Sequence, residues 1–69
     1  MNMLRDEVEQ LLDEVFNEDW EPKNCGRDKC KQLIYAMSKM FPGESFGDST
    51  TGFMCVCKIK EFATIHKLH

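Results

Sequence analysis

The chain has 69 residues, of which 42% are hydrophobic and 30% are charged, and its formal net charge is −3. These values allow one small globular domain over residues 1–69 and exclude a disordered or fibrous chain. No apolar run approaches the roughly 18 residues that a membrane-spanning helix needs, so we expect no membrane contact. The sequence opens without an apolar signal segment, and we therefore expect a cytoplasmic protein with reduced thiols.

The first expected element is an amphipathic helix that starts near Leu4 and ends near residues 17–19. Its apolar residues recur at the spacing of one helix face: they are Leu4, Val8, Leu11, Leu12, Val15 and Phe16. Asn2 is a candidate N-cap, and Pro22 disfavours helical angles at the residue before it. One face of this helix is therefore expected in the core.

A second amphipathic helix is expected over residues 27–41, after a short connector. Its apolar stripe contains Cys30, Leu33, Ile34, Met37, Met40 and Phe41. Pro42 and Gly43 end the pattern. Two such helices joined by a short connection predict a helical hairpin.

Residues 42–52 are rich in turn formers and predict a loop, with Phe46 as its anchor to the core. The residue types of residues 53–59 favour a strand, and its geometry would place Phe53, Cys55, Cys57 and Ile59 on one apolar face. Residues 60–69 fit either a second strand or a helix face made of Ile59, Phe62, Ala63 and His66. We favour a strand, or pairing with a second chain as a homodimer through the strand edge, because a lone strand leaves its backbone groups unpaired.

The expected fold class is therefore α+β, with two amphipathic helices packed on a small antiparallel β-hairpin or strand pair.

Charge is distributed unevenly along the chain. Residues 1–22 hold one basic and eight acidic residues, a net of −7, whereas residues 23–69 hold eight basic and four acidic residues, a net of +4. An acidic run is usually a solvated helix face, but it can also bind a basic surface by charge complementarity. We expect a non-enzymatic protein-interaction or inhibitor module that binds a basic partner, in one version as a mimic of nucleic acid. Its candidate partner-binding residues are Asp6, Glu9, Asp13, Glu14 and Trp20.

Trp20 lies among acidic residues, and its ring is either a plug over the helix ends or a contact anchor. Aromatic residues are common at binding hot spots, but small cores also need large side chains. We favour the plug and keep Trp20 among the partner-binding candidates.

The four cysteines allow an alternative function, that of a small zinc-stabilised domain. Cys25, Cys30, Cys55 and Cys57 could together hold one zinc ion, but neither pair has the usual two-residue spacing, so we favour buried free thiols and no cofactor. In the zinc alternative the basic second helix contacts nucleic acid through Arg27, Lys29, Lys31 and Lys39; otherwise we expect no direct nucleic-acid binding. Only His66 and His69 could serve as a base for a cysteine nucleophile, and we expect no catalytic residue.

The segment from Val8 to Phe41, an amphipathic helix followed by Trp20-Glu21-Pro22 and a second helix, resembles the opening of Tctex-type dynein light chains. Those proteins are dimeric adaptors that pair strands between chains. The present chain is too short for the usual set of strands of that family, and no residue role is carried over from it.

Overall fold

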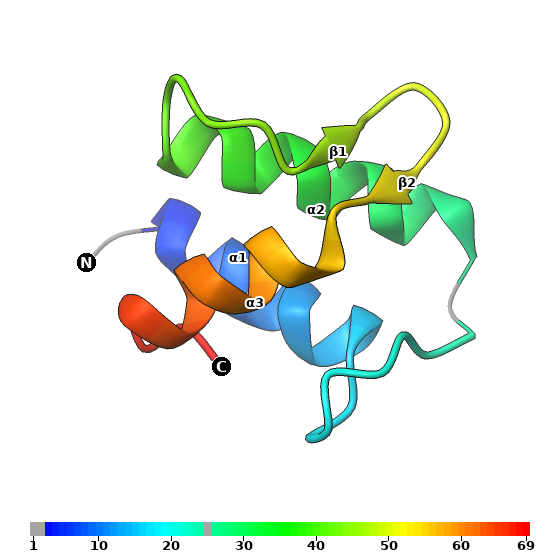
Figure 1. Ribbon diagram of the computed structural model, residues 1–69, viewed down its shortest axis with the longest axis horizontal. Helices are drawn as coiled ribbons and strands as arrows, with labels where there is room; N and C mark the ends of the chain where they lie inside the picture. The colour runs from blue at the N-terminus through cyan, green and yellow to red at the C-terminus, as the bar shows by residue number, and fades with distance from the viewer. Residues whose placement is uncertain (1–2, 25) are drawn as a thin grey trace.

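The computed structural model describes residues 3–24 and 26–69 and shows an α+β fold, as the sequence predicts (Figure 1). In chain order its elements are α1 (Met3–Val15), α2 (Arg27–Met40), β1 (Gly47–Asp48), β2 (Phe53–Met54) and α3 (Val56–Ile65). Asn2, the expected cap of the first helix, and Cys25 lie outside the described residues.

Helices α1 and α2 pack against each other as the expected helical hairpin. The predicted stripes form its interior: Val8, Leu11, Leu12, Val15, Phe16, Leu33, Ile34 and Met37 are all buried. Leu4, Cys30, Met40 and Phe41 are partly buried at the edge of the same core. Helix α2 ends one residue before the expected bound, and α1 ends at Val15, short of the expected residues 17–19. Phe16 is instead paired with Pro22 in an isolated bridge, which turns the chain back at once.

The loop after α2 contains the first strand, which the sequence did not predict. Gly47 pairs with Met54, and Asp48 pairs with Phe53, in an antiparallel register. This hairpin lies along α2 in Figure 1. Gly47 has a φ of 140°, and a Cβ there would collide with the Phe53 carbonyl oxygen, so the close pairing requires glycine. The prediction that Phe46 anchors the loop is confirmed, because its side chain is fully buried.

The strand expected over residues 53–59 is wrong beyond Met54, and so is the second strand expected in residues 60–69. Helix α3 covers Val56–Ile65 and buries Ile59 and Ala63. A helix pairs its backbone groups within its own segment, whereas a strand here would need a neighbour that the short hairpin does not supply. The expected strand edge over residues 55–59 is therefore absent from the described chain, and the strand-edge homodimer loses most of its pairing surface.

The end of α3 has the hydrogen bonds of a Schellman motif. The Leu68 N–H donates to the Ala63 carbonyl at 2.8 Å, and the Lys67 N–H donates to the Thr64 carbonyl at 3.3 Å. Lys67 takes the left-handed position with a φ of 57°, and Leu68 is buried beside the core. The chain thus turns back over α1 and brings His69 to the C-terminal end of that helix.

Candidate functional site

His69 joins the end of α1 to the turn that contains Trp20. Its Nδ1 lies 3.1 Å from the Asp13 carboxylate, and its Nε2 lies 3.4 Å from the Asn17 carbonyl oxygen. The centroid of its ring lies 4.5 Å from that of Trp20, whose ring in turn lies 5.4 Å from that of Phe16. Trp20 is thus half-buried between the core and His69, while the Asp13 side chain remains 75% exposed.

The turn after α1 is held by the Asn17 side chain. Its Oδ1 accepts hydrogen bonds from the N–H groups of Asp19 at 2.9 Å and Glu21 at 3.0 Å. Trp20 lies between them with a φ of 62°, a left-handed conformation that is costly for a large side chain. Contacts of its ring with Phe16 and His69 offset that cost. We name the carboxylates of this turn, Glu18, Asp19 and Glu21, the acidic turn.

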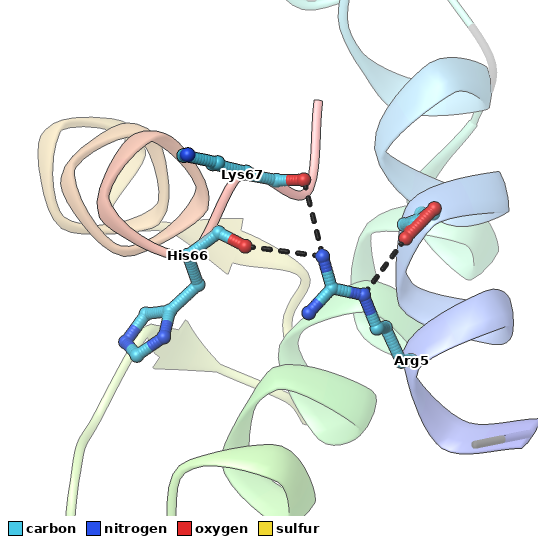
Figure 2. A network of polar contacts seen from close by, with 4 residues as sticks. Arg5, His66 and Lys67 are labelled. Carbon is cyan, nitrogen blue, oxygen red and sulfur yellow. Dashed lines mark hydrogen bonds and ion pairs between the residues drawn. The ribbon is translucent and has the colours of Figure 1, made fainter. Parts of the chain in front are cut away.

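Glu9 is engaged inside the molecule. Its Oε1 lies 3.1 Å from the Arg5 Nε, one helical turn earlier on α1. Figure 2 shows the same guanidinium reaching the carbonyl groups of His66 and Lys67 at the end of α3. Glu9 therefore orients a side chain that links two helices, and its removal would also affect the fold.

Glu14 lies on a different flank of α1. Its carboxylate is 3.1 Å from the Lys29 Nζ on α2, whereas Asp13 faces the C-terminal residues through His69. The four acidic residues predicted on α1 therefore do not form one continuous surface, because adjacent positions on a helix point in different directions. Glu14 helps to join α1 to α2.

Asp6 is exposed and forms no ion pair with any described residue. The same holds for the three carboxylates of the acidic turn, so the exposed negative charge extends from α1 past Trp20. We define the acidic surface as Asp6, Asp13, Glu18, Asp19 and Glu21 around Trp20. The sequence prediction omitted the three residues of the acidic turn, although the acids that flank Trp20 were a visible signal.

The cysteines occupy other positions than the expected strand face. Cys55 precedes the first residue of α3 and Cys57 lies in its first turn; both are exposed, so burial on an apolar face is wrong for them. Cys30 is half-buried, and Cys25 lies outside the described residues. In residues 3–24 and 26–69, no three side chains of His, Cys, Asp or Glu gather as metal ligands.

The basic residues of α2 divide into two sets. Lys29 is paired with Glu14, whereas Arg27, Lys31 and Lys39 form no ion pair within the described part of the chain. Lys39 Nζ lies 4.8 Å from the centroid of the Tyr35 ring, and the Arg27 guanidinium carbon lies 5.8 Å from that of Phe53. Exposed aromatic rings therefore accompany the unpaired cations. No pocket opens in the described structure.

The chain matches no family model, no curated protein and no solved structure. The likeness of residues 8–41 to Tctex-type light chains therefore stays an expectation from the sequence. Within the described ranges, none of the helices has the length and apolar character needed to cross a membrane.

Proposed function

We propose that the chain is a non-enzymatic protein-binding module whose acidic surface binds a basic protein. The observation that carries this proposal is the position of Trp20, a half-buried aromatic ring flanked by the unpaired carboxylates of Glu18, Asp19 and Glu21. Binding hot spots commonly combine an aromatic anchor with charges that steer the partner into place. Asp6 and Asp13 extend the same negative charge along α1.

The ion pairs within the molecule reduce the set of partner-binding residues that the sequence predicts. Glu9 and Glu14 are each held by a cation of the same molecule, so a partner cation would have to compete with Arg5 or Lys29. Asp6 and Trp20 remain, Asp13 stays 75% exposed although its carboxylate contacts His69, and the acidic turn joins these three residues. An inhibitor that occupies a nucleic-acid-binding surface is one form of this function, because closely spaced carboxylates resemble phosphates in charge.

The test removes charge without changing size. Asp6→Asn, Glu18→Gln, Asp19→Asn and Glu21→Gln together should leave the fold intact, since even exposed ion pairs contribute only about 0–1 kcal/mol to folding and these residues form none with a described residue. A control neutralises three other exposed acids, as Glu7→Gln, Asp28→Asn and Glu61→Gln, and so removes one charge fewer.

Proteins that bind the wild-type chain in an extract of its host, and are lost with the acidic-surface variant, are then purified and titrated at low and high salt. We expect weaker binding and a smaller salt dependence for the acidic-surface variant, and near-native behaviour for the control. Equal affinity and equal salt dependence for all three proteins would refute the proposal.

A further inference from the structure

One face of α2 carries unpaired cations and exposed aromatic rings in a single row. Arg27, Lys31, Tyr35 and Lys39 recur every four residues, and side chains at this spacing form a ridge along a helix. Phe53 of β2 extends the row at its start, because its ring lies beside the Arg27 guanidinium. We name these five residues the basic ridge.

The basic ridge combines solvent-exposed aromatic rings with cations that lack a carboxylate partner. Tyr35 is 59% exposed and Phe53 is 69% exposed, while the three cations find no carboxylate among the described residues. Asp28 is the single carboxylate of α2 and lies outside the four-residue row. Aromatic residues and arginine are enriched in protein interfaces, where burial and charge pairing satisfy both.

The acidic turn has the opposite charge, and it forms no ion pair with the ridge of its own molecule in the described structure. The Lys23 N–H is bonded to the Val15 carbonyl, and Lys23 Nζ is bonded to the Asp13 carbonyl at 2.7 Å, so the connector is fastened to the end of α1. The ion pair that joins α1 to α2 uses Glu14 and Lys29 instead. Each copy therefore presents an unpaired acidic turn and an unpaired basic ridge on separate parts of its surface.

We propose that the basic ridge of one copy binds the acidic turn of a second copy of this chain. This inference rests on the proposed function, since it names the basic surface that the acidic surface meets. Glu18, Asp19 and Glu21 supply three negative charges for Arg27, Lys31 and Lys39. Trp20 and the exposed Pro22 supply apolar contact for Tyr35 and Phe53.

This contact should be weak and sensitive to salt. Exposed ion pairs are individually weak and are screened by added ions, so the aromatic rings must supply the rest of the affinity. A contact between two different patches can close as a reciprocal pair or continue from copy to copy. The sedimentation coefficient at rising protein concentration measures the association directly.

The experiment uses the whole chain and two charge-reversed variants. The ridge variant carries Lys31→Glu and Lys39→Glu, and the turn variant carries Glu18→Lys and Asp19→Lys. We expect the wild-type chain to associate at low salt and to dissociate at high salt. Each variant alone should associate at least about tenfold more weakly, because its two surfaces then have the same sign. An equimolar mixture of the two variants should restore association, since each ridge then meets a turn of opposite charge.

A control with Lys60→Glu and Lys67→Glu reverses two exposed cations off the ridge and should associate like the wild-type chain, and circular dichroism establishes that every variant is folded. A wild-type chain that stays monomeric at low salt, or a mixture that fails to associate, overturns the inference. Binding of a single-stranded oligonucleotide by the monomeric chain, lost in the ridge variant, would overturn it in favour of nucleic acid. The proposed function has a separate test. It still holds after such a failure if the wild-type chain binds a basic protein in the extract and the acidic-surface variant does not.

Discussion

The Arg5 guanidinium donates a hydrogen bond of 3.2 Å to the carbonyl oxygen of His66, 61 positions later in the chain (Figure 2). A second hydrogen bond of 3.3 Å reaches the Lys67 carbonyl oxygen. The last carbonyl groups of a helix have no partner within the helix and carry partial negative charge, so a cation there is favourable. A side chain from the start of α1 thus stabilises the end of α3, and Glu9 holds that side chain in place.

Replacement of Arg5 should therefore weaken the end of α3. Arg5→Met keeps most of the apolar stem but removes the donors, and we expect the free energy of unfolding to fall by about 1 kcal/mol. Arg5→Lys should recover part of the loss, because one ammonium group cannot reproduce the planar fork of a guanidinium. Urea denaturation measures both.

Lys60→Met on α3 is the matched control, since Lys60 is exposed and forms no ion pair with a described residue. Its stability should stay within about 0.5 kcal/mol of the wild-type value. Equal losses for Arg5→Met and Lys60→Met would show that the link between α1 and α3 contributes nothing.

The two predicted apolar stripes can be tested by placing a charge in each. Leu11 is 4% exposed and Ile34 is 2% exposed, so Leu11→Asp or Ile34→Asp would bury an unpaired carboxylate in the helical hairpin. We expect loss of the cooperative thermal transition, since the cost of several kcal/mol approaches the whole stability of a small domain.

Gln10→Asp and Gln32→Asp serve as neighbouring controls on the exposed sides of α1 and α2. Both should retain a cooperative transition near the wild-type temperature. A cooperative transition for Leu11→Asp or Ile34→Asp would contradict the assignment of the buried faces.

The helical hairpin could be predicted because each stripe repeats over several turns, and only a helix face explains so long a pattern. The segment from Phe53 to Ile59 is different. Its residues are apolar apart from Lys58, which suits a buried strand, but Ile59 and the following Ala63 also lie one helical turn apart, so the short run fits both structures. The choice is made by tertiary contacts, because the helix buries Ile59 and Ala63 in the core.

The candidate site was only partly predictable for a related reason. The distribution of charge along the sequence indicated the acidic residues. The pairing of Asp13 with His69 and of Glu14 with Lys29, however, depends on how distant segments pack. Local periodicity holds no information about such contacts. The exposed positions of Cys55 and Cys57 likewise follow from α3, which the short apolar run did not distinguish from a strand.

Asp48 predicts a dependence of the β-hairpin on pH. A hydrogen bond of 2.8 Å from the Thr50 N–H stabilises the carboxylate and lowers the pKa of Asp48 below its ordinary value, and hydrogen bonds from Thr51 act in the same direction. A lowered pKa in the folded state means that the contribution is complete above the ordinary pKa and is lost as the pH falls through the lowered value. The Thr50 amide proton should therefore shift on acidification.

Nuclear magnetic resonance of the Thr50 amide proton at decreasing pH gives the midpoint of the Asp48 titration, which we expect below the ordinary pKa of aspartate. Asp48→Asn keeps an oxygen acceptor for Thr50 but cannot ionise, so its Thr50 signal should not follow the same titration. A wild-type midpoint at or above the ordinary value would refute the hydrogen bond to the carboxylate.

Lys67 offers a stabilising substitution at the end of α3. Its φ of 57° lies in the left-handed region. Glycine adopts this conformation without steric cost, whereas the Cβ of any other residue causes strain. Lys67→Gly keeps the N–H that bonds to Thr64 and the carbonyl that accepts from Arg5, since both belong to the backbone. We expect the free energy of unfolding to rise by about 0.5–1 kcal/mol, the strain relieved at such a position less the greater freedom of glycine in the unfolded chain.

The same substitution inside α3 should have the opposite sign. Lys60→Gly places glycine in a helix interior, where it costs about 1 kcal/mol relative to good helix formers. Urea denaturation of the two variants beside the wild-type chain therefore separates the left-handed cap from the helix body. A loss of stability in Lys67→Gly similar to that in Lys60→Gly would mean that α3 continues through Lys67. In that case Leu68 would no longer fold back over the core, and His69 would not reach Asp13 and Trp20.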